Sequence, residues 1–153
     1  MSQTTVDKYF LLILLADGLV WLKSSYGKFS GGDFVAGLPA TFGKFASKNP
    51  YPRFKDFLTS TAIPNYQVFG NLVLWGELFV AVAIVGLTAL LLFGVKLNKP
   101  WLILLKLGLL GGAFLNLIFF LASGWTSPST ESLNLLMLAV QAVGLVWVMR
   151  SSF

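Results

Sequence analysis

The chain has 153 residues, of which 56% are hydrophobic and only 11% are charged, and its formal net charge is +5. Soluble domains carry about 25% charged residues, so this composition excludes an ordinary soluble domain and indicates an integral membrane protein. The chain has no cysteine and no histidine, so we expect no metal, haem or iron–sulfur cluster and no thiol exchange.

Four apolar stretches make up most of the chain, at residues 9–26, 68–95, 101–125 and 132–149. A helix rises about 1.5 Å per residue and the hydrocarbon layer is about 30 Å thick, so one crossing needs about 20 apolar residues. The pattern predicts an all-α fold, a membrane-spanning four-helix bundle that forms a single domain over residues 1–153. We expect a long extramembrane loop with short amphipathic helices between spans one and two.

The first stretch has two interpretations. Residues 10–16 form a compact apolar core after Lys8, which is typical of a signal peptide. The apolar run resumes past Asp17, however, and no clear small-x-small cleavage pattern closes it. We therefore interpret residues 9–26 as a membrane span that stays in the mature protein.

Asp17 places a carboxylate inside this first span. On a helix, Asp17, Trp21 and Lys28 share one face. A carboxylate near mid-span costs about 2.5–3.5 kcal/mol on insertion scales, so we expect Asp17 to face the bundle, with Lys23 or Lys28 as its counter-charge. A structural ion pair, or lysines that extend to the membrane interface, explains the same pattern without a function.

The segment at residues 23–67 holds most of the net charge. Six basic residues minus two acidic ones give +4: Lys23, Lys28, Lys44, Lys48, Arg53 and Lys55 against Asp33 and Asp56. We expect Asp33 to cap a short helix that Pro39 kinks, and residues 49–52 to break the chain before a second short amphipathic helix. Such a lid can collect anions, and adhesion to acidic lipid headgroups explains the charge equally well.

Span two contains Asn71 and Glu77. The face of Glu77 continues through small and moderate side chains to Thr88, which lets a neighbouring helix approach. At this depth a carboxylate is expected to be neutral, or to be paired with Lys106 or Lys28. A functional role is the usual interpretation of an acid inside a membrane, and a structural hydrogen bond is the alternative.

Spans three and four each carry a polar stripe. Gly108 and Gly112 in span three are typical of close helix packing, and Asn116 lies on the same stripe. Span four has three polar residues on one face, which must contact protein or a wet cavity: Glu131, Asn134 and Gln141. Glu131 can instead stabilise the first turn of its helix.

Several short motifs together resemble those of a known family. They are Gly27-Lys28, Asn49-Pro50-Tyr51-Pro52, Phe57-Leu58, Ile63-Pro64-Asn65, Phe69-Gly70, Gly76-Glu77 and Glu131-x-x-Asn134. In this order they are similar to the DoxX-like membrane proteins, and among these to the DoxD-type small subunits of thiosulfate:quinone oxidoreductases. The chain departs from the family pattern after span two, where Gly94-Val95-Lys96 replaces an expected Thr-Arg pair.

This resemblance implies a membrane subunit of a quinone-linked oxidoreductase, in which thiosulfate gives electrons to membrane quinone. It implies a second redox subunit or a homo-oligomer, and a cytoplasmic membrane location with both termini in the cytoplasm. Glu77 and Asp17 are then the candidate catalytic residues for proton transfer, and Trp21 and Trp75 the candidates for flanking quinone. The candidate contacts for the small anionic substrate are Lys28, Lys44, Lys48, Arg53, Asn71, Asn116, Glu131, Asn134 and Gln141.

Two functions from other classes remain open. The lack of metal and thiol ligands is compatible with a non-catalytic scaffold or assembly subunit for a redox partner. The polar faces of spans two and four are compatible with a small anion transporter. The basic residues have no aromatic platforms for base stacking in a soluble domain, so we expect membrane lipid as a partner and no nucleic acid.

Overall fold

The structure is a computed structural model that describes the backbone of residues 3–150 and the side chains of residues 7–150. Four long helices make up most of it: α1 (Gln3–Gly31), α4 (Tyr66–Leu92), α5 (Lys99–Ser123) and α6 (Pro128–Arg150). Each is long and apolar enough to cross a membrane. No strand occurs within residues 3–150. The predicted all-α bundle with four membrane-spanning helices is therefore confirmed.

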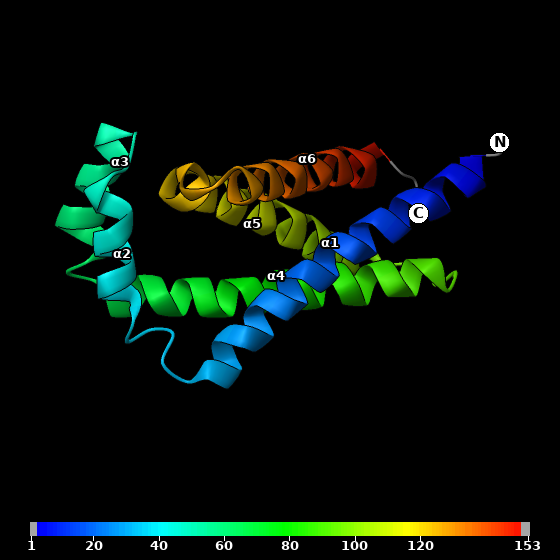
Figure 1. Cartoon of the computed structure of the whole chain (residues 1–153). Coiled ribbons are helices and arrows are strands. Elements are labelled where there is room, and N and C mark those ends of the chain that lie inside the picture. Colours follow the sequence, from blue (N-terminus) through cyan, green and yellow to red (C-terminus); the bar gives the residue numbers. More distant parts are fainter. Residues whose placement is uncertain (1–2, 151–153) are drawn as a thin grey trace.

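The four long helices form two pairs. Helix α1 packs mainly against α4, and α5 packs mainly against α6. Figure 1 shows α1 crossing α4 obliquely, while α5 and α6 run side by side. The start of α1 and the end of α6 lie at the same end of the bundle (Figure 1), as an even number of spans requires.

The outward faces of these helices are apolar. Leu72 on α4, Phe114 on α5 and Leu136 on α6 each expose more than 60% of their surface. In water such a continuous apolar belt would be unfavourable, whereas hydrocarbon is its natural solvent. The exposed faces therefore indicate a multi-pass membrane protein in contact with lipid.

The short elements between α1 and α4 form a cap at the other end of the bundle (Figure 1). They are α2 (Leu38–Ser47), α3 (Pro52–Phe57) and the π-helical turn η1 (Leu58–Ala62). Asn49 ties the cap to the bundle, because its Nδ2 donates to the backbone oxygen of Leu121 on α5 at 3.0 Å. A short 3₁₀ turn, η2 (Gly124–Thr126), links α5 to α6.

Two expectations for the cap were wrong. Helix α2 begins at Leu38 after Gly37, with no side-chain cap, so Asp33 does not cap it. Pro39 lies in the first turn of α2 and does not kink it. A proline is tolerated there because a first-turn N–H has no partner within the helix anyway.

Small residues bring the helices of the core close together. A Cβ atom on Gly108 of α5 would lie 2.8 Å from the Cβ of Ala83 on α4, so only glycine allows this contact. On α4 the predicted face of Glu77 is buried as expected, through Ala81, Ile84 and Thr88. The structure therefore confirms the predicted packing stripes on α4 and α5.

Candidate functional site

Glu77 belongs to a charged network between α1 and α4. The Glu77 side chain is fully buried, and its Oε2 forms an ion pair with Lys28 Nζ at 2.7 Å. Ser24 Oγ donates to the same carboxylate oxygen at 2.9 Å and accepts from Lys28 Nζ at 2.8 Å. Ser24 and Lys28 are one turn apart on α1, so helix periodicity points both toward Glu77. We call these three residues the charged network.

Asp17 belongs to a second cluster, the amide network of Asp17, Gln141 and Asn116, all of them buried. Gln141 Nε2 on α6 donates to Asp17 Oδ2 at 2.9 Å, and Asn116 Nδ2 on α5 donates to Gln141 Oε1 at 2.9 Å. Gly112 makes room for this chain, because a Cβ atom there would lie 2.8 Å from Gln141 Nε2. The amide network thus joins three of the four long helices.

The expected pairing of Asp17 with a lysine was wrong. Lys28 is used by Glu77, and Lys23 lies on an exposed face of α1. Lys28 is eleven residues from Asp17, about 16 Å along a helix, which is beyond the reach of its side chain. For Glu77 two partners were expected as alternatives, and the structure selects Lys28 over Lys106.

An aromatic cavity of about 290 Å³ lies between the cap and the bundle. Seven phenylalanines contribute to its walls: Phe34, Phe42, Phe45, Phe54, Phe57, Phe69 and Phe119. Lys28 is the only charged residue in the described lining, and its Nζ lies 5.3 Å from the centre of the Phe34 ring. We call this space the phenylalanine cavity. The charged network therefore adjoins it through Lys28.

The chemistry of Lys28 limits what the phenylalanine cavity can hold. An ammonium group has three N–H donors, of which Glu77 and Ser24 use two. The third N–H has no hydrogen-bond partner among the described residues, and Lys28 lines the cavity, so this N–H can donate to an oxygen atom of a ligand. The Lys28–Glu77 pair has no net charge, so a dianion would lose its hydration here without compensation. A flat apolar ring with a carbonyl oxygen fits these walls better.

Most of the other candidate substrate contacts lie elsewhere. Lys44, Lys48 and Arg53 are exposed on the cap, and Glu131 is exposed near the start of α6. Two amides bond to the backbone of their own helices: Asn71 donates to Gln67 O and Asn134 to Thr130 O, both at 2.8 Å. Asn116 and Gln141 belong to the amide network. Of the nine candidate contacts, Lys28 alone lines the phenylalanine cavity.

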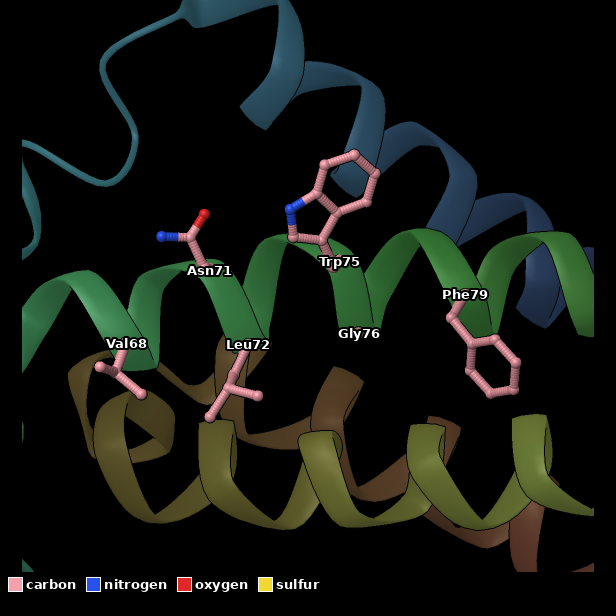
Figure 2. A pocket seen from close by; sticks show the side chains of 6 residues that line it. All are labelled: Val68, Asn71, Leu72, Trp75, Gly76 and Phe79. Carbon is pink, nitrogen blue, oxygen red and sulfur yellow. The ribbon is translucent and has the colours of Figure 1, made fainter.

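The two tryptophans proposed to flank quinone have different surroundings. Trp21 is 2% exposed and packs inside the bundle, with its ring 6.1 Å from that of Phe119. Trp75 is 58% exposed and borders an open groove on α4. Figure 2 shows Trp75 and Asn71 on one side of this groove, with Leu72 and Phe79 directed toward α5. Neither tryptophan lines the phenylalanine cavity.

Sequence reasoning missed Ser24 and the aromatic walls of the phenylalanine cavity. Phe34, Phe42 and Phe45 form an amphipathic pattern before the proline-rich run at residues 49–52. Phe54 and Phe57 lie after that run. In the sequence this pattern indicates an amphipathic helix, and a helix that lies on a membrane surface shows the same periodicity. The sequence signal for this packing was a pair of apolar helix faces, one before and one after the proline-rich break.

No family model, curated protein or solved structure matches this chain. The resemblance to DoxX-like proteins therefore stays a prediction. Within the described residues, no group of three carboxylate side chains lies close enough to hold a metal ion. The charged network and the phenylalanine cavity together form the candidate functional site.

Proposed function

We propose that this chain is the quinone-binding membrane subunit of a quinone-linked oxidoreductase whose electron donor is thiosulfate. One observation carries the proposal: an ammonium group, backed by a buried carboxylate, lies in the wall of a phenylalanine-lined cavity. The cavity volume of about 290 Å³ is close to the lower end of the range for small-molecule pockets, about 300–1,000 Å³. That size suits a single substituted ring.

The residues of the charged network have distinct roles in this proposal. Lys28 donates its third N–H to a ring oxygen, while phenylalanine side chains pack on the ring and exclude water. The Glu77 carboxylate accepts a hydrogen bond from Lys28 and holds its ammonium group at the cavity wall. A quinone bound there would accept two electrons and two protons, and two thiosulfate ions release two electrons when they join through a sulfur–sulfur bond.

We place the oxidation of thiosulfate outside the phenylalanine cavity, on the side of the cap. Lys44, Lys48 and Arg53 are exposed there, and positive charge raises the local concentration of a dianion and its rate of encounter. A second redox subunit docked on the cap would then receive thiosulfate near the cavity. This arrangement keeps the dianion in water, where its hydration is retained.

The test uses the protein in lipid nanodiscs with a short-tailed quinone analogue. Lys28→Gln replaces the charged ammonium donor by a shorter, neutral amide, and the lost charge-assisted bond is worth about 1.5–3 kcal/mol, or roughly 10- to 150-fold in affinity. Lys23→Gln removes the same charge from an exposed face of α1 and should change affinity little. Equal quinone affinity in the two variants would overturn the proposal.

Turnover separates the parts of the proposal. Thiosulfate-dependent reduction of the analogue by the purified complex, lost in Glu77→Gln, supports the whole assignment. Quinone binding without thiosulfate turnover overturns the choice of donor. A stable co-purifying partner without quinone binding favours the scaffold function, and anion uptake into vesicles without redox change favours transport.

A further inference from the structure

Four polar side-chain atoms in the bundle have no hydrogen-bond partner among the described residues. They are Asp17 Oδ1, Trp21 Nε1, Glu77 Oε1 and Thr88 Oγ1. The residues that carry them expose 6%, 2%, 0% and 0% of their surface. Buried polar groups are almost always paired, with ordered water where no protein group is available. Four such atoms in one small bundle therefore indicate bound water.

The residues that carry these four atoms lie on α1 and α4, the two helices with the most extensive mutual contact, and we call this contact the seam. On α1, Asp17 and Trp21 are one turn apart and on the same face as Ser24. The two helices run antiparallel: Ser24 meets Glu77 at 2.9 Å, whereas a Cβ atom on Gly18 would lie 2.8 Å from Val85 Cγ2. Moving from Ser24 back to Asp17 on α1 thus corresponds to moving from Glu77 toward Thr88 on α4.

The chemistry of these atoms fits water and does not fit a cation. The two carboxylate oxygens are acceptors, the indole N–H is a donor only, and the hydroxyl can act as either. A water molecule can accept from Trp21 and donate to a carboxylate, which satisfies both groups. A metal ion would instead face the positive end of the indole N–H dipole. Asp17 and Ser24 are seven residues apart, about 10.5 Å along the helix, a length that a few hydrogen-bonded waters can bridge.

We propose that water molecules occupy this seam and connect Asp17 to Glu77 through hydrogen bonds. The water donates to the free oxygen of each carboxylate and accepts from the Trp21 N–H. Trp21 positions the water between the two carboxylates.

The hydration of the seam does not depend on which ligand the phenylalanine cavity binds. If that ligand is a quinone, the seam brings water to the Glu77 carboxylate beside the cavity. The two proposals can therefore fail separately. A hydrated seam in a protein that does not bind quinone would contradict only the proposed function. A dry seam in a protein that binds quinone would contradict only the hydration of the seam.

Water-edited solid-state NMR of isotope-labelled protein in lipid bilayers tests the inference. We expect magnetisation transfer from water to the Trp21 indole and to the carboxyl carbons of Asp17 and Glu77. The methyl groups of Leu105, which is fully buried in the core on α5, are the control and should receive none. Transfer to the three seam residues no greater than to Leu105 would overturn the inference.

A Trp21→Phe variant sharpens the result, because it removes the N–H and keeps an aromatic ring. We expect the variant to lose water transfer to Asp17 and Glu77 while the α-helical content and the Leu105 signals stay unchanged. Unchanged transfer to both carboxylates in this variant would show that Trp21 does not position the water.

Discussion

The charged network and the amide network each hold one buried carboxylate, but they satisfy it in different ways. Glu77 has a cation and a hydroxyl on one oxygen, whereas Asp17 has the neutral amide of Gln141. The charged network reaches the phenylalanine cavity through Lys28, and the amide network is enclosed by α1, α5 and α6. A lysine with one unused N–H is thus placed at the wall of a cavity that a ligand can enter, whereas buried amides join the helices inside the bundle.

The largest effect on stability is expected when only one partner of the Lys28–Glu77 ion pair is removed. Lys28→Met leaves Glu77 buried without a cation and should lower the free energy of unfolding by about 3–5 kcal/mol. The double variant Lys28→Met with Glu77→Leu removes both charges and should regain most of that loss. Denaturant unfolding in mixed micelles measures both, with Lys23→Met as control. If Lys28→Met is as stable as Lys23→Met, the ion pair between Lys28 and Glu77 is contradicted.

The amide network should be disrupted when a single methyl group is added at Gly112. Gly112→Ala places a Cβ against Gln141 and should cost about 1–3 kcal/mol of unfolding free energy through overpacking. The matched control is Gly111→Ala, whose Cβ would meet Val80 Cγ2 at an ordinary 3.5 Å. This control should be neutral or stabilising by up to about 1 kcal/mol, because alanine favours helix more than glycine does. Equal stability of the two variants would argue against a constrained Gln141.

The position of the cap should respond to a similar change on α4. A Cβ on Gly70 would lie 2.6 Å from Leu38 Cδ1 and 3.0 Å from Val35 Cγ1. Gly70→Ala should therefore displace the start of α2 and weaken binding of the quinone analogue, with an overpacking cost near the lower end of about 1–3 kcal/mol because Leu38 can move. Gly76→Ala, which meets Leu115 at 3.6 Å, is the control. Equal affinity of the Gly70→Ala and Gly76→Ala variants for the quinone analogue would rule out a role for the cap in closing the cavity.

The exposed charges of the cap should have the smallest effect. Replacing Lys44, Lys48 and Arg53 by glutamine should leave the free energy of unfolding unchanged, because these residues are exposed. It should remove the dependence of thiosulfate turnover on salt concentration, since steering by exposed charge is screened within about 10 Å at 0.1 M salt. The measurement is the apparent KM for thiosulfate at several ionic strengths. A triple variant with the salt dependence of the original protein would exclude steering by the cap.

The sequence predicted the fold and the buried acids for a simple physical reason. A carboxylate in an apolar span must face protein, so Glu77 and Asp17 were placed inside the bundle. Their partners depend on how α1 crosses α4, which no local pattern contains. This crossing brings Lys28 to Glu77 and leaves Asp17 to Gln141.

The phenylalanine cavity was not predicted because its walls come from six elements spread between Lys28 and Ser123. Phe34 and Phe69, for example, come from opposite sides of the cap segment, and Phe119 comes from the end of α5. An amphipathic helix on a membrane surface and one covering a cavity have the same sequence periodicity. Tertiary packing decides between them.

The location of bound quinone tests the central claim most directly. A photoreactive quinone analogue can be crosslinked to the protein in nanodiscs and the modified residues identified by mass spectrometry. We predict adducts on the walls of the phenylalanine cavity, such as Phe34, Phe57 and Phe119, with fewer adducts in Lys28→Gln than in Lys23→Gln. Adducts confined to the open groove around Trp75, unaffected by Lys28→Gln, would contradict the account.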